Sequence, residues 1–198
     1  MSEQEALWIK RAQHGDDSAF ENLVESYQKP VFSLCYRMLG NVNDAEDAAQ
    51  ESFIRAYRHI KRYDPNRPFA TWLLSISAHY CIDRSRKRRL PTISTDALPA
   101  EIIPDRSLPD PERELHKQEK EERIQNLMKE LKPTDRAAVV LRYWHEYSEL
   151  EIAEALNLSV SAVKSRLYRA RKSLAVAWLA SEESTAVNER RPHESPAF

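Results

Sequence analysis

The sequence predicts an all-α protein with two helical domains joined by a flexible linker, the second containing a helix-turn-helix. Only 2 Gly occur among 198 residues, which disfavours glycine-rich phosphate loops and β-rich folds that need tight glycine turns. Hydrophobic residues make up 41% of the chain and charged residues 31%, a composition typical of globular proteins. The length suits one large domain or two small ones, and the charge pattern favours two.

Charged residues are unevenly distributed along the chain, although the formal net charge is only −1. Residues 55–89 contain ten Lys and Arg against two acids, and residues 156–178 contain five bases and no acid. Between them, residues 91–122 carry nine acids, four bases and five prolines. Two basic segments on either side of an acidic, proline-rich connector indicate two domains that contact one polyanion at two places.

These changes in composition predict the domain boundaries. We expect a helical domain over residues 1–90, a flexible linker over 91–112, a second helical domain over 113–180 and a disordered tail over 181–198. Fully extended, the linker reaches roughly 75 Å at about 3.4 Å per residue. That is about two turns of duplex DNA, so the two domains can reach two separate sites on one duplex.

Breaks and caps mark the ends of the expected helices. Gly15 and Gly40 are each expected to end a helix, because the residues around them provide stop and cap signals. Asn43 is followed three residues later by a glutamate, which is the spacing of a capping box. In the second domain, Thr134 is expected to cap a helix over residues 135–144.

A proline-rich turn over residues 64–68 precedes a helix expected over residues 69–88. Small polar side chains recur every four positions along this helix beside aromatic neighbours. They are Thr71, Ser75, His79, Asp83 and Lys87. Unpaired bases stack on aromatic rings and hydrogen-bond through their exposed edges, so this helix is a candidate surface for single-stranded nucleic acid. Phe69 and Trp72 have the alternative role of core residues.

The end of the same helix is strongly basic. Its cationic side chains are Arg84, Arg86, Lys87, Arg88 and Arg89. We expect this cluster to contact phosphates.

A short helix, a turn and a longer basic helix form the most specific local pattern in the chain. Ser148 and Glu151 have capping-box spacing before the short helix. Asn157 stands at the turn and tolerates left-handed backbone, and Ser159 caps the final helix. This order is typical of a DNA-binding helix-turn-helix. The alternative is an ordinary helical hairpin with a solvated charged face.

One face of the final helix carries a continuous polar and basic stripe at helical spacing. It consists of Ser161, Lys164, Ser165, Tyr168, Arg169 and Lys172. Side chains near the start of such a helix reach base edges in the major groove. Arg166 and Arg171 lie to the sides of the stripe and suit phosphate contacts.

Other classes of function find little support in the sequence. Cys35 and Cys81 are far apart and lack metal-ligand spacing, so we expect core thiols in a reducing cytoplasm. The longest apolar run, residues 174–180, is far shorter than the roughly 18 residues of a membrane helix. The 6 His are scattered, and no nucleophile–base pair or nucleotide loop stands out, so we expect no metal, no cofactor, no membrane insertion and no enzymatic activity.

Three segments resemble the bacterial extracytoplasmic-function (ECF) sigma factors, the small alternative sigma subunits of RNA polymerase. They are RMLGNVNDAEDAAQESFIRAY (37–57), FATWLLSISAHYCIDRSRKRR (69–89) and LSVSAVKSRLYRARKSL (158–174). The resemblance runs from about residue 6 to residue 178. Two positions depart from it: His79 stands where the family commonly has Asn, and Ser161-Ala162 where it often has Gly-Thr.

The resemblance implies a role for each segment. The first would dock on the β′ clamp helices of core RNA polymerase through Asp44, Asp47, Gln50 and Glu51. The second would bind the single-stranded minus-ten promoter element and capture a flipped base. Its expected contacts are Phe69, Thr71, Ser75, His79, Asp83, Arg84, Arg86 and Lys87.

The resemblance also assigns roles to the second domain. The helix-turn-helix would read the minus-thirty-five element of promoter DNA. Its expected contacts are Ser161, Lys164, Ser165, Arg166, Tyr168, Arg169, Arg171 and Lys172. Leu141 and its neighbours would bind the β flap of the polymerase, and an anti-sigma factor would hold the protein inactive.

The implied function is that of an alternative sigma factor, which directs polymerase to promoters and assists melting. The alternative is a free-standing helix-turn-helix regulator that binds duplex DNA without polymerase. A gel shift with and without core enzyme separates the two, because a sigma factor binds promoters strongly only as holoenzyme.

Overall fold

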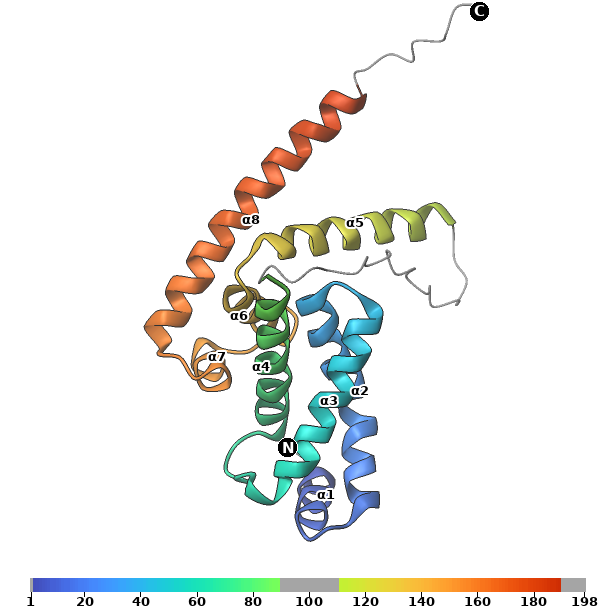
Figure 1. Ribbon diagram of the computed structural model, residues 1–198, viewed down its shortest axis with the longest axis vertical. Helices are drawn as coiled ribbons and strands as arrows, with labels where there is room; N and C mark the ends of the chain where they lie inside the picture. The colour runs from blue at the N-terminus through green and yellow to red at the C-terminus, as the bar shows by residue number, and fades with distance from the viewer. Residues whose placement is uncertain (1, 90–110, 190–198) are drawn as a thin grey trace, which may run out of the picture.

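The structure is a computed structural model that describes residues 2–89 and 111–189, with side chains described for 2–88 and 120–180. The described residues form helices and turns without a strand, which confirms the predicted all-α class. The elements are α1 (Glu3–Gln13), α2 (Asp17–Leu39), α3 (Val42–His59), the 3-10 turn η1 (Ile60–Arg62), α4 (Phe69–Arg89), α5 (Pro111–Glu130), α6 (Pro133–Tyr143), α7 (Glu149–Leu156) and α8 (Val160–Glu189). We call α1–α4 the N-terminal domain and α5–α8 the C-terminal domain (Figure 1).

The N-terminal domain is a bundle in which α2 packs against α1, α3 and α4. Leu23, Leu34 and Leu73 are almost fully buried in its core, and each such side chain contributes about 1.5–3 kcal/mol relative to an exposed one. Cys35 and Cys81 are free thiols with no exposed surface. The prediction of two core thiols is therefore confirmed.

The glycine breaks of the N-terminal domain lie where the sequence places them. Gly15 and Gly40 have φ of +92° and +71°, in the left-handed region that favours glycine. The predicted cap at Asn43 is wrong, because Asn41 caps α3 by accepting a hydrogen bond from the Asp44 backbone N–H at 3.0 Å. Asn41 directly follows the left-handed glycine and has extended backbone, so the helix starts earlier than the capping-box spacing suggests.

In the C-terminal domain, the predicted cap at Thr134 is also wrong. The helix α6 begins at Pro133, and Lys132 stands at the N-cap position without a side-chain hydrogen bond. Proline suits the first helical position because its fixed φ is already helical and its missing N–H has no partner there in any case. Thr134 therefore lies inside the first turn.

The last helix is longer than expected. The disordered tail predicted over residues 181–198 is wrong for 181–189, because α8 continues to Glu189 (Figure 1). No Pro or Gly interrupts this stretch, so nothing in the backbone stops the helix there. Residues 190–198, and most of the predicted linker (91–110), lie outside the described residues.

The two domains touch one another directly. The helices α6 and α7 of the C-terminal domain pack beside α4, and α6 also contacts α2 (Figure 1). The buried Arg136 of α6 donates from Nη1 to the carbonyl of Met38 in α2 at 2.6 Å. Composition predicted two domains on a linker but gave no sign of this contact.

Within residues 2–89 and 111–189, none of the helices combines the length and apolar character needed to cross a bilayer.

Candidate nucleic-acid interface

The outer face of α3 carries three of the four residues that the resemblance assigns to polymerase docking. The Asp47 side chain is 66% exposed, and Gln50 is exposed. Glu51 is half-buried and accepts a hydrogen bond from Arg55 Nε at 2.7 Å. This face offers acidic and amide groups to an incoming protein.

Asp44 does not lie on that outer face, and its expected outward placement is wrong. The residue is only 8% exposed. Its Oδ1 lies 2.5 Å from Arg84 Nη2 and its Oδ2 lies 2.6 Å from Arg88 Nη2, so one carboxylate holds two arginines of α4. Asp44 is in the first turn of α3, where the helix macrodipole also favours a negative charge. The carboxylate therefore joins α3 to α4.

A hydrophobic residue on the outer face of α3 escaped the sequence reasoning. Ile54 is 45% exposed and lies one helical turn beyond Gln50 and Glu51. An apolar side chain at this spacing on a charged face was a usable signal, because large exposed apolar groups often mark protein contacts. The face therefore combines acidic groups with an exposed apolar side chain.

The polar row of α4 winds around the helix. Four residues correspond to about 400° of rotation at 3.6 residues per turn, so each step drifts by about 40°. The first member, Thr71, is 5% exposed, and Ser75 is half-buried and donates to the Trp72 carbonyl at 2.7 Å. His79 and Asp83 are exposed. The row therefore starts beneath neighbouring helices and ends in solvent, which the sequence spacing alone did not reveal.

Phe69 is a core residue, so its expected position on the DNA-binding surface is wrong. It is 2% exposed and packs in a cluster of aromatic rings. Its centroid lies 5.3 Å from Tyr27, 5.4 Å from Tyr63 and 5.5 Å from Trp72. Edge-on and tilted contacts of this kind add stability beyond the buried area. Phe69 supports the turn before α4 by packing against Tyr63, and Trp72 is half-buried in the same aromatic cluster.

His79 presents a hydrogen-bond acceptor to solvent. Its Nδ1 lies 2.8 Å from the Ser75 carbonyl, and a carbonyl oxygen can only accept. In the neutral ring, Nδ1 therefore carries the proton and Nε2 is left as the acceptor. An exposed acceptor can bind the amino edge of an unpaired base.

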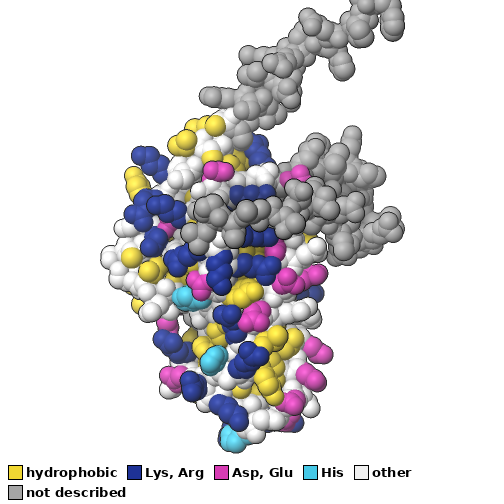
Figure 2. Space-filling view, in the orientation of Figure 1, with side chains coloured by type: hydrophobic (Ala, Val, Ile, Leu, Met, Phe, Trp, Pro, Cys, Tyr) yellow, Lys and Arg dark blue, Asp and Glu magenta, His cyan; other side chains and the backbone are white. Residues whose placement is uncertain are grey.

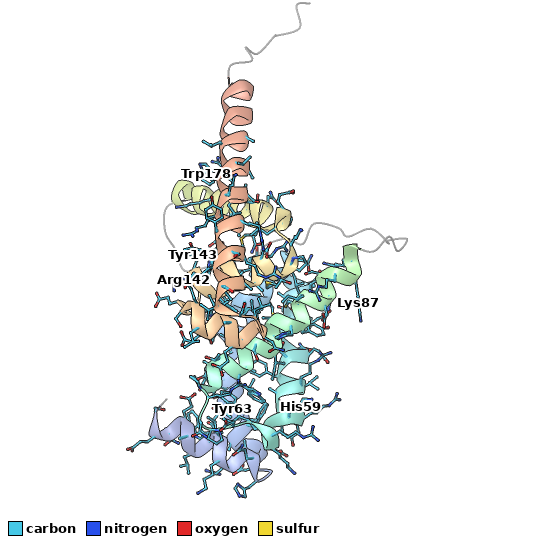
Figure 3. The ribbon with its side chains drawn as sticks, turned by 90° about the vertical axis from the view of Figure 1, so that its left-hand side faces the viewer. His59, Tyr63, Lys87, Arg142, Tyr143 and Trp178 are labelled. Atoms are coloured by element: carbon cyan, nitrogen blue, oxygen red, sulfur yellow. The ribbon has the colours of Figure 1, made fainter. Side chains whose placement is uncertain are left out.

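The basic side chains at the end of α4 differ in their surroundings: Arg84 is paired within the protein, and others are exposed. Arg84 is half-buried against Asp44, whereas Lys87 is exposed and projects from the end of the helix (Figure 3). Arg86 is exposed, with Nη1 3.8 Å from Asp83 and Nη2 3.4 Å from Thr134 Oγ1. The side chain of Arg89 lies outside the described residues. Arg86 and Lys87 are therefore more accessible to a ligand than Arg84.

The helix-turn-helix is formed by α7 and the start of α8. The predicted capping box is confirmed: Ser148 Oγ accepts from the Glu151 N–H at 3.2 Å, and the Glu151 carboxylate accepts from the Ser148 N–H at 2.8 Å. The Ser148 hydroxyl also donates to the Glu151 carboxylate at 2.7 Å, and this bond together with the one from the Ser148 N–H lowers the pKa of Glu151. Asn157 has φ of 54°, as its place in the turn predicted. Ser159 Oγ accepts from the Ala162 N–H at 3.2 Å at the start of α8.

The predicted stripe on α8 is exposed, whereas the neighbouring Arg166 is half-buried. All six members are on the surface: Ser161, Lys164, Ser165, Tyr168, Arg169 and Lys172. Tyr168 is 63% exposed, and Lys164 Nζ lies 3.6 Å from Glu149 Oε2 of α7. Figure 2 shows many Lys and Arg side chains over the face where α4, α6 and α8 lie in Figure 1.

Arg166 differs from the exposed basic residues of α8, because it forms a largely buried ion pair with an acid of α6. Its Nη1 lies 2.6 Å from Oδ1 of Asp135 in α6, and the Asp135 residue is only 7% exposed. The pair fastens α8 to α6. Arg171, by contrast, is exposed and available to a phosphate.

Leu141 lies in the centre of the C-terminal core, so its expected contact with another protein is wrong. It has no exposed surface. Tyr143, in the last turn of α6 and labelled in Figure 3, is 54% exposed. The period of the apolar residues in α6 does not separate core from surface, because nearly the whole helix is buried.

The part of the chain that the structure describes contains no cluster of three or more His, Cys, Asp or Glu that could hold a metal ion.

Both halves of the chain match known sequence families. Residues 23–90 match Sigma-70 region 2, and residues 121–174 match Sigma-70, region 4. The chain is 41% identical over 175 residues to the ECF RNA polymerase sigma factor SigW of Bacillus subtilis, a match that covers 84% of this chain and 92% of that protein. It is 33% identical over 178 residues to the RNA polymerase sigma-H factor of Pseudomonas aeruginosa, covering 87% and 92%.

Solved structures are similar over most of the chain. CnrH, solved in complex with the cytosolic domain of CnrY, is similar with a TM-score of 0.66 and 25% identity, over 90% of this chain and 99% of that one. The sigma factor RpoE from Bartonella quintana, solved with the anti-sigma factor NepR, has a TM-score of 0.61 and 17% identity, over 80% and 96%. The second likeness concerns the fold alone.

Proposed function

Because the chain belongs to the ECF family of RNA polymerase sigma factors, we propose that its two domains divide promoter recognition between single-stranded and double-stranded DNA. The chain is an alternative sigma factor that directs RNA polymerase. In the proposal, the N-terminal domain binds the separated minus-ten strand and the C-terminal domain binds the intact minus-thirty-five duplex. The protein supplies specificity and assists melting in the cytoplasm, and the polymerase supplies the chemistry.

The exposed basic stripe of α8 is the observation that carries this proposal. It follows a capped short helix and a left-handed turn at Asn157, the arrangement that places a recognition helix in the major groove. Arg169 is exposed on this stripe and can donate to guanine O6 and N7. We expect Arg169→Ala to reduce discrimination between promoters by about 1–3 kcal/mol. Equal losses on all DNA sequences would instead make Arg169 a phosphate contact.

In the N-terminal domain, we assign minus-ten contacts to the half-buried and exposed members of the polar row and to its basic end. The residues are Ser75, His79, Asp83, Arg86 and Lys87. Thr71 contributes only when it is uncovered, and Arg84 acts by positioning α4 against α3. The exposed Nε2 of His79 replaces the amide that the family commonly has at this position.

The outer face of α3 is the proposed docking surface for the polymerase core. We expect the double variant Asp47→Lys, Glu51→Lys to abolish core binding without unfolding the protein, because both changes are made on the outer side of the helix. The matched control is Glu21→Lys, Glu25→Lys, two exposed acids at the same spacing on α2. Co-purification with polymerase that survives the α3 reversal would remove this surface from the proposal.

We also propose that an anti-sigma factor holds this chain inactive. The support is that RpoE of Bartonella quintana, which shares this fold, was solved with the anti-sigma factor NepR, and that the similar CnrH was also solved with a bound partner, the cytosolic domain of CnrY. A pull-down of the full chain from cells before and after stress tests this partner: a protein that leaves the chain as transcription begins is expected.

The deciding experiment is run-off transcription with core enzyme on a randomised promoter library. We expect initiation at a defined pair of elements only when the chain and the core are both present. A gel shift on the selected promoter then separates the two modes of action. Strong specific binding by the chain without core would favour a free-standing helix-turn-helix regulator.

A further inference from the structure

Hydrogen bonds within α4 use up the donors of two side chains in its polar row. Ser75 is half-buried, and its Oγ donates to the Trp72 carbonyl at 2.7 Å, so the hydroxyl proton is directed at the helix backbone. His79 Nδ1 lies 2.8 Å from the Ser75 carbonyl and, in the neutral ring, donates its proton to that oxygen. The groups that remain for a ligand are the lone pairs of the Ser75 hydroxyl and of His79 Nε2, which are acceptors.

Asp83 continues this row one helical turn beyond His79. Its side chain is 65% exposed, and an ionised carboxylate accepts hydrogen bonds but donates none. The distance from its Oδ1 to Arg86 Nη1 is 3.8 Å, and a contact of that length between two exposed side chains is weak. We call Ser75, His79 and Asp83 the acceptor row, because each of them offers acceptors to a ligand.

The exposed donors of α4 lie beyond the acceptor row, at the basic end of the helix. Arg86 and Lys87 are exposed, and their side chains carry only donors (Figure 3 labels Lys87). Arg86 is seven residues after His79, which is about 10 Å along the helix axis. Cationic donors suit phosphate groups, which carry no sequence information. The groups suited to phosphates are therefore separated along α4 from the acceptor at His79.

Unpaired bases differ in the groups that an acceptor would meet. Adenine and cytosine each carry an exocyclic amino group, N6 or N4, which donates hydrogen bonds. Thymine has the carbonyl oxygen O4 at the corresponding place, and that oxygen can only accept. Two acceptors repel one another, and no donor of the acceptor row stands beside His79 to bind O4. An acceptor directed at this edge of the base therefore favours adenine or cytosine over thymine.

We infer that His79 determines base specificity within the minus-ten element: its Nε2 accepts a hydrogen bond from the amino group of an unpaired adenine or cytosine and disfavours thymine. The inference rests on the proposed function, because the base belongs to the separated strand that α4 binds. The bond from Nδ1 to the Ser75 carbonyl fixes the imidazole, so the ring presents the acceptor and not a donor. An asparagine at this position carries a donor and an acceptor on one amide, and would accommodate thymine as well.

The test replaces His79 with asparagine in the full chain assembled with core polymerase. Histidine and asparagine have similar helix propensities and position 79 is exposed, so we expect His79→Asn to keep the fold. The matched control is His14→Asn. His14 is an exposed histidine at the end of α1, and its Nδ1 lies 2.7 Å from the carbonyl of Lys10, four residues earlier, as in His79. Circular dichroism of both variants checks that their helix content is unchanged.

The probes are pre-melted promoters that carry the library-selected elements, with the two strands made non-complementary over the minus-ten element. Because this element is unpaired from the start, the stability of the duplex does not enter the comparison. Each position of the element, in one strand and then in the other, is filled with 5-methylcytosine or with thymine. These two bases share the ring and its methyl group, and they differ in the hydrogen-bonding groups at C4 and N3. Run-off product is measured for every pair of probes.

We expect the wild-type chain to give about two- to tenfold more product with 5-methylcytosine than with thymine at one position, the effect of one hydrogen bond. In His79→Asn this ratio falls to near one at that position and stays unchanged at the others. His14→Asn keeps the wild-type ratio at every position. A change confined to one base position identifies a specificity-determining side chain, because a structural defect lowers initiation on all probes.

Three results would overturn the inference. They are a wild-type ratio near one at every position, a ratio that survives in His79→Asn, and an equal change of the ratio in His14→Asn. Initiation still depends on the chain in each of these cases, so the proposed function stands. If the wild-type chain with core polymerase initiates on none of the probes, the proposed function itself fails.

Discussion

Replacing Asp44 with Asn tests whether this carboxylate is a structural link between α3 and α4. The change removes one negative charge and keeps the size of the side chain. Arg84 is 27% exposed in its side chain, and its hydrogen bond to Asp44 is of the charged, partly buried kind that contributes about 1.5–3 kcal/mol. Arg88 is 51% exposed, so its contact adds roughly 0.2–1 kcal/mol. We expect the variant to lose about 2–3 kcal/mol in the free energy of unfolding.

The assay is urea denaturation of the full chain, followed by far-UV circular dichroism. Asp47→Asn is the matched control, because Asp47 is 66% exposed and lies 3.4 Å from the same arginine. We expect the control to change stability by less than about 0.5 kcal/mol. A double-mutant cycle with Arg84→Gln isolates the pair, with an expected coupling of about 0.5–3 kcal/mol. A loss in Asp44→Asn no larger than in the control, with no coupling to Arg84, would refute the structural role and return Asp44 to the docking face.

Three further predictions concern the C-terminal domain. Arg166→Ala should lower the free energy of unfolding by about 1–3 kcal/mol, because it leaves the buried Asp135 without its partner. The control Arg171→Ala should change it by less than about 0.5 kcal/mol, and chemical denaturation of both variants measures the difference. Burial lowers the pKa of His145 in the folded chain below its usual value of 6.5. Between the folded and unfolded pKa values of this residue, the unfolded chain therefore binds more protons than the folded chain. The free energy of unfolding should fall as pH decreases from about 7.5 to 5. His145→Gln should flatten that dependence in denaturation curves, and a parallel decline in the variant would contradict this account. Leu141→Ala should cost about 2–5 kcal/mol in thermal unfolding, since the side chain has no exposed surface; a neutral change would place it at the surface after all.

Short sequence patterns predicted the structure correctly where residues interact with others close to them in the chain. The capping box of Ser148 and Glu151, the left-handed Asn157 and the glycine breaks depend on residues within one turn of each other. The exposed stripe of α8 followed in the same way from helical spacing. The failures at Asn43 and Thr134 were also local. In both cases a stronger signal nearby, a left-handed glycine or a proline at the first helical position, fixed the start of the helix instead.

The errors in the candidate site have a different origin. Asp44 and Arg84 are 40 positions apart, and Asp135 and Arg166 are 31 apart. Each residue looked like a surface charge when it was considered on its own helix. Only the packing of one helix on another showed that these charges neutralise each other inside the protein, which is why Arg166 and Arg84 act within the fold.

The sequence by itself determined the helical class, the two basic surfaces and the family, because composition, helical period and short-range caps are properties of neighbouring residues. Tertiary structure alone decided which charges face outward and which part of α4 is covered, because these depend on side chains from distant segments that meet only after folding. Thr71 illustrates the difference: helical spacing alone places it in the polar row, but it is buried beside Tyr147, a residue of the other domain.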